Sequence, residues 1–393
     1  REYMRRVCDE IWIIDLGGEG RGTRKTENVF NIQTPVAIAI AARYGKSEKE
    51  KPADVHYTII EGSREEKLSS LSALSCFEDL KWETCPKDWQ APFRPKGKGK
   101  YFQWPLLTDL FPWQQSGVKA GRTWVIAPNS DTLMRRWRRL CASSSQELPS
   151  LFKESPTGRK VTDTPMQLPP SDERMKALAT LSKKDPCPPF IRYSYRSLDR
   201  QYVFHDSRML DRAGPALWLA HGDYQVYLVS LLSHPLGMGP ALVTCNMVPD
   251  LHYFRGSYGG KDVMPLYRDS GADEANVAPG LLKLLEEQYG CEVTPEDFLS
   301  YVYGTLAHPE YTERFQQDLK AKEIRLPLTK DRKYFQVARD VGKRLIWLHT
   351  YGERLIPSGR KRGVIPTGTT KCTKAVPESN DRYPEKYSYD AEA

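Results

Sequence analysis

Two apolar runs that flank a glycine-rich segment constrain the start of this chain more than any other feature. Ile11–Leu16 and Val36–Ala42 are almost wholly apolar and have the length of strands, and Gly17–Lys25 lies between them. Apolar residues at helical spacing precede the first run, and Val55–Ile60 is a further candidate strand. The pattern predicts an amphipathic helix and buried strands at one edge of an α/β sheet, which we expect to end near residue 62.

The glycine-rich segment does not match a nucleotide-binding loop. Gly17 and Gly22 have the spacing of a phosphate loop, but Thr23 and Arg24 stand where lysine and a hydroxyl residue are needed. Thr23 also occupies the last glycine position of the dinucleotide-binding pattern. A glycine-rich connection that carries basic residues is therefore the better interpretation.

The positive charge of the chain is concentrated in one window, residues 94–139. Its ten Lys or Arg against two acids give a difference of +8, which equals the net charge of the whole chain. Seven aromatic residues share the window, more than a solvated charged face requires. Arginine contacts phosphates and guanine, and aromatic rings stack on bases, so the window favours a nucleic-acid surface. A solvated basic surface or an RNA-facing patch remains the alternative.

A second stretch, Ile191–Gly222, interleaves arginines with aromatic residues. Its alternative interpretation is a strand-rich fold with core tyrosines and solvated arginines. Arg192 and Arg196 are the better candidates for DNA contact. The other three arginines are followed or preceded by acids, which predicts ion pairs of Arg200, Arg208 and Arg212 with Asp199, Asp206 and Asp211.

Residue spacing excludes several other classes. The eight cysteines form no CxxC pair and the seven histidines no HxH or HxxxH pair, so we expect reduced thiols and no metal site. No GxSxG motif is present, which argues against a self-contained hydrolase. The scattered cysteines fit a cytoplasmic protein, and the mean hydropathy of −0.59 without a long apolar run predicts no membrane span. The chain starts with Arg1, and we expect further sequence upstream.

The second half of the chain changes from strand-like to helical patterns. Residues 143–189 are rich in Ser, Pro and Lys, which predicts loop and linker. From Pro279 the patterns are helical, and Thr294 followed by Pro295 and two acids predicts a helix start. Residues 356–393 lack apolar periodicity and predict a mostly disordered tail.

Several stretches resemble the C-terminal part of type ISP restriction–modification enzymes, large single chains that join nuclease, helicase, methyltransferase and target-recognition domains. The resemblance rests on these segments: Arg1–Ile40, Ser116–Pro128, Arg192–Arg212, Pro265–Asp269 and Val293–Lys320. The last of them, VTPEDFLSYVYGTLAHPEYTERFQQDLK, is the most specific. One departure from the family lies at Ile324–Pro327, which lacks the first proline of the family's Pro-Arg-Ile-Pro element.

The resemblance implies recognition of an asymmetric DNA site and adenine methylation with S-adenosylmethionine. This sequence contains no Asn-Pro-Pro-Tyr loop, so we expect the catalytic residues and the cofactor motif upstream, and a fragment that is inactive alone. In amino-methyltransferases an aromatic residue stacks on the flipped base, and Phe30 stands where that residue is expected. The alternative is that Phe30 plugs the edge of the sheet.

The expected architecture is α/β, with terminal strands of a Rossmann-like methyltransferase sheet and then a mixed α+β DNA specificity domain with a helical C-terminal part. The expected domains are 1–62, the end of the methyltransferase, 63–355, the target-recognition domain, and 356–393, the tail. Double-stranded DNA and an upstream methyltransferase core are the expected partners. A non-enzymatic nucleic-acid-binding or protein-docking module is the alternative. The residues predicted to contact DNA are Arg122, Arg135, Arg136, Arg138, Arg139, Arg192, Arg196 and Lys261.

Overall fold

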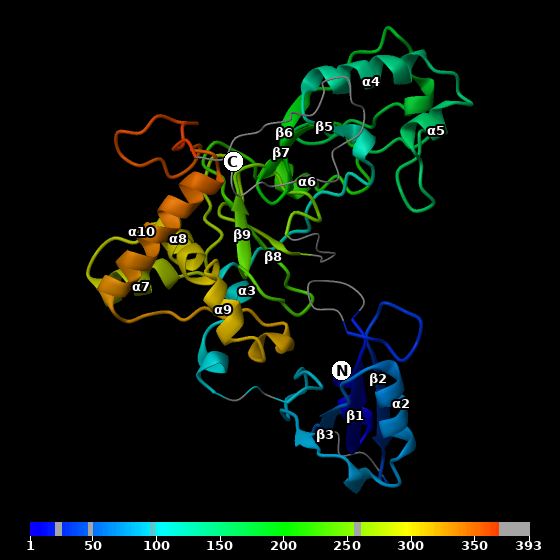
Figure 1. Cartoon of the computed structure of the whole chain (residues 1–393), viewed down its shortest axis with the longest axis vertical. Helices are drawn as coiled ribbons and strands as arrows, with labels where there is room; N and C mark the ends of the chain where they lie inside the picture. The colour runs from blue at the N-terminus through cyan, green and yellow to red at the C-terminus, as the bar shows by residue number, and fades with distance from the viewer. Residues whose placement is uncertain (20–25, 46–49, 96, 98, 255–260, 369–393) are drawn as a thin grey trace. The chain divides into compact units, whose positions relative to one another are not determined.

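The computed structural model describes residues 1–19, 26–45, 50–95, 97, 99–254 and 261–368 (Figure 1). The predicted tail beyond residue 368 and the basic part of the glycine-rich segment lie outside these described residues. The chain forms two compact units. The first comprises Arg1–Pro105 with the segments His234–Met238 and Phe315–Pro327, and the second comprises the remainder.

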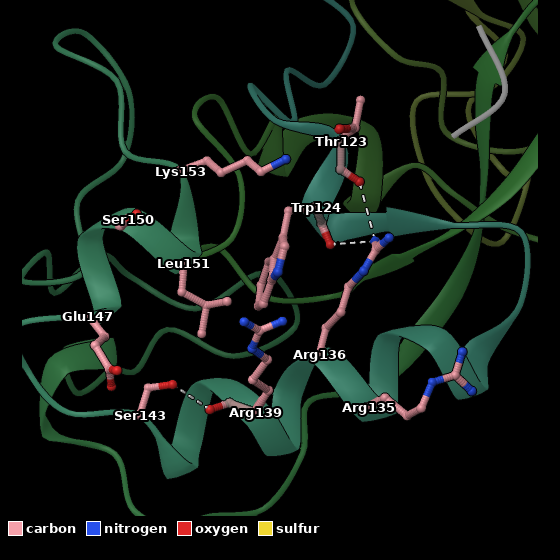
Figure 2. Close-up of a pocket in the computed structure, with 10 residues that line it drawn as sticks. All are labelled: Thr123, Trp124, Arg135, Arg136, Arg139, Ser143, Glu147, Ser150, Leu151 and Lys153. Carbon is pink, nitrogen blue, oxygen red and sulfur yellow. Dashed lines mark hydrogen bonds between the residues drawn. The ribbon is translucent and has the colours of Figure 1, made fainter. Parts of the chain in front are cut away.

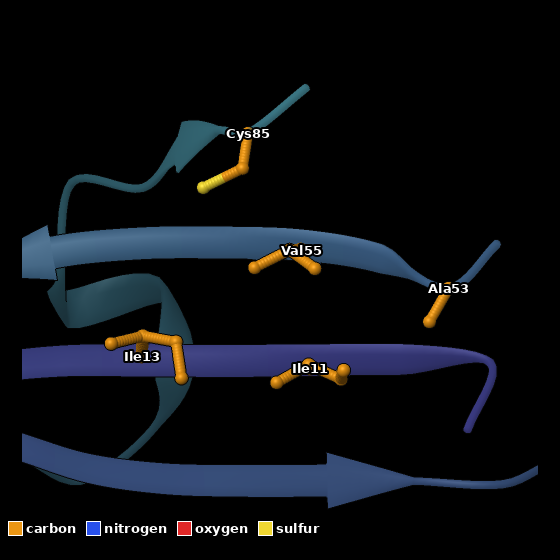
Figure 3. Packing of buried hydrophobic residues seen from close by; sticks show 5 residues of the cluster. All are labelled: Ile11, Ile13, Ala53, Val55 and Cys85. Atoms are coloured by element: carbon orange, nitrogen blue, oxygen red, sulfur yellow. The ribbon is translucent and has the colours of Figure 1, made fainter. Parts of the chain in front are cut away.

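A mixed four-stranded sheet of order β2-β1-β3-β4 forms the first unit, with β1 parallel to β3 and antiparallel to β2. Side chains alternate along β1, so both faces of this strand are buried. Ile11 and Ile13 pack with Val55 on one face (Figure 3), and Ile14 and Leu16 pack on the other. The elements are α1 (Glu2–Val7), β1 (Glu10–Gly17), β2 (Val36–Ala42), β3 (Asp54–Ile59), α2 (Arg64–Ser72) and β4 (Glu83–Thr84).

The strand predicted at Val36–Ala42 is present, but the prediction that it is buried is wrong. β2 stands at the end of the sheet and pairs with β1 along one side. Ile38 and Ile40 are 37% and 38% exposed, and Ala37, Ala39 and Ala41 are exposed as well. An edge strand can leave side chains uncovered on both faces, whereas the apolar run alone predicts a central one.

The glycine turn after β1 is closed by the chain's own side chains. Gly18 has φ +94°, and a Cβ there would lie 2.4 Å from the Asn28 amide nitrogen. The backbone NH of Gly18 donates to the Thr26 hydroxyl (2.9 Å), and Asn28 donates to the Gly18 carbonyl (3.1 Å). Glycine is needed here because Asn28 fills the space of a side chain.

Late segments of the sequence complete the first unit. The backbone NH of Leu326 donates to the Pro105 carbonyl (3.0 Å), and the Tyr101 hydroxyl donates to the Glu323 carbonyl (2.5 Å). Leu326 is fully buried, so the element that departs from the family pattern is part of the core.

The second unit contains two antiparallel three-stranded sheets, β5-β7-β6 and β10-β8-β9. Segment 143–189, predicted as linker, is instead packed into this unit, because Phe152 and Leu178 are fully buried. The elements of the second unit are α3 (Leu107–Leu110), β5 (Ile126–Ala127), α4 (Ser130–Ala142), α5 (Leu148–Phe152), β6 (Phe190–Arg196), β7 (Asp199–Phe204), α6 (Pro215–Leu219), β8 (Tyr227–Ser230), β9 (Leu242–Cys245), β10 (Val263–Pro265), α7 (Leu281–Tyr289), α8 (Pro295–Leu306), α9 (Pro309–Arg314) and α10 (Arg332–His349).

The predicted helical C-terminal part is confirmed. Thr294 caps α8 by accepting a hydrogen bond from the Asp297 backbone NH (3.1 Å), and the Asp297 carboxylate reciprocates. Helices α8 and α10 approach closely through glycines, since a Cβ at Gly342 would lie 1.8 Å from the Ser300 carbonyl oxygen. Such contact requires residues without side chains at the crossing.

Candidate nucleic-acid interface

Helix α4 carries the densest group of predicted DNA-contacting arginines. Asn129 caps the helix by accepting a hydrogen bond from the Thr132 backbone NH (2.9 Å). Leu133, Trp137 and Leu140 are buried on the inner face. The arginines divide between the two faces of the helix: Arg135, Arg138 and Arg139 are exposed, and Arg136 is buried.

The guanidinium of Arg136 is used inside the domain. It donates to the carbonyl oxygens of Trp124 (2.7 Å) and Ile126 (2.8 Å), and so attaches α4 to the start of β5. Figure 2 shows this side chain rising from α4 toward the backbone carbonyls of Thr123 and Trp124. Arg136 therefore holds the helix that presents the exposed arginines.

Arg122 is also buried. Its guanidinium donates to the Asp211 carboxylate (2.7 Å) and the Arg159 carbonyl (3.2 Å), and lies over the Phe152 ring at 4.0 Å. Burial lowers the pKa of Arg122, and the Asp211 carboxylate opposes this change. The structure thus places Arg122 and Arg136 in packed networks, while their predicted contact with DNA stays a prediction.

Between α4 and α5 lies a basic hollow of about 680 Å³, called the α4–α5 pocket below (Figure 2). The Arg139 side chain points toward Trp124 and Leu151, and the Lys153 ammonium points toward Thr123. Arg135 and Arg136 also line the pocket. Sequence reasoning missed Lys153, because it belongs to the segment that was predicted to be linker.

The β6–β7 hairpin presents the second group of arginines. The Arg192 guanidinium lies over the Tyr202 ring at 4.7 Å, and Arg196 lies over Tyr195 at 3.9 Å. Arg196 also donates to the Asp250 carboxylate (2.7 Å). Planar guanidinium groups held against aromatic rings are suited to recognising bases and phosphates.

Asp250 organises the base of this hairpin. Its carboxylate accepts from the Tyr193 hydroxyl (2.6 Å), and burial together with this carboxylate raises the pKa of Tyr193 well above its usual range. Of the predicted ion pairs, Arg208 with Asp206 is confirmed (2.6 Å), and both side chains are buried. Arg200 pairs with Glu353 (2.8 Å). The hairpin is therefore fixed by long-range partners as well as by its own sequence.

A family described as the Type ISP C-terminal specificity domain matches residues 109–393. The chain belongs to this family. No curated protein matches the chain by sequence. Among solved structures, the DrdV–DNA complex has a TM-score of 0.55 at 19% identity, and covers 88% of this chain and 36% of that one.

Two further solved structures are titled as type ISP restriction–modification enzymes. A nuclease-deletion mutant of LlaGI, in complex with a DNA substrate mimic, has a TM-score of 0.52 at 16% identity, covering 88% of this chain and 28% of that one. ATP-dependent LlaBIII, bound to DNA, has a TM-score of 0.54 at 16% identity, and the match covers 89% of this chain and 24% of LlaBIII. These likenesses show a shared fold, mixed α/β with several small sheets, and the chain spans about a quarter to a third of those proteins.

All eight predicted DNA-contacting residues lie within the matched specificity domain, and Phe30 lies outside it. Lys261 is exposed, with φ +63°, and follows directly after residues 255–260, which are outside the described part. The Phe30 side chain is 61% exposed, and its backbone NH donates to the Asn28 side chain (2.9 Å). Such exposure does not fit a residue that plugs the sheet edge.

Among the described residues, no three His, Cys, Asp or Glu side chains gather as metal ligands would. None of the described helices is long and apolar enough to cross a membrane.

Proposed function

We propose that this chain recognises a specific sequence in double-stranded DNA, as the target-recognition part of a restriction–modification enzyme. Membership of the specificity-domain family supports this function, and the similar solved structures are titled as DNA complexes. The observation that carries the proposal is the division of arginines on α4. Three of them are exposed on a helix of that domain, and a fourth fastens the helix from inside.

The exposed cations differ in their role. Arg135, Arg138 and Arg139 contact phosphates, which positions the protein on the duplex without selecting a sequence. Arg192 and Arg196 are held against tyrosine rings and reach base edges, since arginine donates two hydrogen bonds to guanine. Lys261 contributes a further contact with the DNA backbone. Arg122 and Arg136 act indirectly, by fixing the segment that precedes β5 and α4.

The first unit belongs, in this proposal, to an adenine methyltransferase domain that continues upstream. Residues 1–62 supply its terminal, Rossmann-like strands and residues 63–355 form the recognition domain. The apolar, exposed strand β2 supports this, because an apolar edge strand is usually paired or covered. The exposed Phe30 ring is available to stack on a flipped adenine.

The methyl donor, S-adenosylmethionine, would be bound by the upstream core and not by this chain. The side chains of Asn28 and Thr26 fill the turn at Gly18, so the described part of the glycine-rich segment has no space there for a cofactor. The chain itself supplies recognition and, through Phe30, a surface for the extruded base.

The test is selection of binding sites by the purified chain from a random duplex library, followed by sequencing and gel-shift titration. We expect one asymmetric motif to be enriched. The variant R135E/R138E/R139E should lose binding, whereas a charge-matched control that reverses three exposed lysines, Lys183, Lys184 and Lys283, should retain it. Enrichment of no motif, or equal binding by the arginine variant, would refute the proposal.

A further inference from the structure

The α4–α5 pocket has the composition of an anion site. Three of its lining side chains, Arg135, Arg139 and Lys153, are exposed cations, and Glu147 is its single acid. With the buried Arg136 the lining carries four cations against one carboxylate. A concave surface of one sign focuses its electric field and attracts the opposite charge.

Two of these cations are not used by the domain itself. Within the part of the chain that the structure describes, neither the Arg139 guanidinium nor the Lys153 ammonium makes a hydrogen bond or an ion pair. The neighbouring Glu147 carboxylate is already engaged, since it accepts from the backbone NH (3.1 Å) and the hydroxyl (2.9 Å) of Ser144. These hydrogen bonds, with a smaller effect of Arg139, lower the pKa of Glu147.

The walls around the two cations are partly apolar. Trp124 is 8% exposed, and its ring stacks on Phe204 with centroids 6.0 Å apart and an interplanar angle of 17°. Leu151 forms the facing wall (Figure 2). Trp124 is thus held by the core and offers little free face to a base. Apolar walls reduce the local dielectric constant, which strengthens the attraction between a cation and an anion.

We propose that the α4–α5 pocket binds a phosphate of the DNA backbone between Arg139 and Lys153, with Arg135 at its rim. This inference rests on the proposed function and deepens it by adding Lys153 and by separating affinity from sequence reading. Arginine and lysine side chains only donate hydrogen bonds, so a pair of them suits the oxygens of a phosphate, which only accept. The pocket therefore strengthens binding to every duplex alike.

The test measures DNA affinity against salt concentration for the whole chain, with the selected site and with a scrambled duplex. Each lost phosphate contact reduces the slope of log K against log salt by about 0.9. The variant R139Q/K153Q loses one phosphate contact, so we expect a slope smaller by about 0.9, and between about 50 and 200 mM salt the wild type should lose about 3.5-fold more affinity than the variant. The preference for the selected site should stay unchanged. The matched control is K183Q/K184Q, which removes two exposed charges outside the pocket.

A neutral methylphosphonate, placed at one backbone position at a time, identifies the phosphate. One position should weaken wild-type binding and have no further effect on R139Q/K153Q. An unchanged salt slope, an equal change in the control, or loss of site preference alone would overturn the proposal.

Calorimetry with inorganic pyrophosphate separates this proposal from the proposed function. If the chain binds no DNA, binding of pyrophosphate by the wild type and its loss in R139Q/K153Q would show an anion site for free phosphates in place of the backbone site. The absence of both DNA and pyrophosphate binding would overturn the pocket as a phosphate site altogether.

Discussion

Removal of the Asp211 carboxylate should destabilise the second unit strongly. Asp211 and Arg122 are 4% and 3% exposed at their side chains, and their charged groups lie 2.7 Å apart. The Asp211 carboxylate also accepts from the Arg159 backbone NH (2.8 Å). In D211A the Arg122 guanidinium remains as a buried charge and that backbone NH loses its acceptor. Breaking a buried ion pair from one side costs about 3–5 kcal/mol, a large part of typical domain stability of about 5–15 kcal/mol.

Urea denaturation followed by tryptophan fluorescence measures the free energy of unfolding. We expect D211A to lose about 3–5 kcal/mol, and R122M/D211A to lose less than the two single variants combined, because no charge is then left unpaired. D172A is the matched control, since Asp172 is exposed, and should change stability by less than about 0.5 kcal/mol. A loss in D211A of under about 1 kcal/mol would refute the reasoning.

Two further variants test other parts of the structure. In G342A the new methyl group would meet the Ser300 carbonyl between α8 and α10. The protein should therefore unfold at a lower temperature, although alanine favours helices over glycine by about 1 kcal/mol. The control is V341A, at a 49% exposed position, and an equal effect of both variants on the unfolding temperature would contradict this expectation. Burial raises the pKa of Asp262 from 3.8 to about 7. Between these two pH values the Asp262 carboxyl group therefore keeps its proton in the folded state and releases it in the unfolded chain. Stability should therefore fall as the pH rises between these values and stay lower above them, whereas D262N should show no such fall in denaturation series across pH; parallel curves for both proteins would contradict the assignment.

Local sequence patterns were sufficient to predict most helices and strands. The apolar runs became β1 and β2, and the Thr294 motif begins α8 as predicted. These signals act within a few residues, through side-chain alternation and capping, so they are visible in the sequence. The burial of Arg136 could also be predicted from the sequence, because Arg136 lies three residues after Leu133 and four before Leu140, on the apolar stripe of α4.

Other features depend on partners that are distant in the sequence. Arg122 meets Asp211, 89 residues away, and the two short runs of residues that complete the first unit come from beyond residue 233. Strand β2 has the composition of a central strand, and only its position in the sheet exposes it. No local pattern encodes such positions.

The sequence by itself determined the family, the basic window and the order of most helices and strands. The tertiary structure decided which arginines are exposed and which are buried, and it brought Lys153 and Arg139 into the lining of one pocket. The physical reason is that charge and periodicity are properties of neighbouring residues, whereas burial and the convergence of charges follow from packing between distant segments.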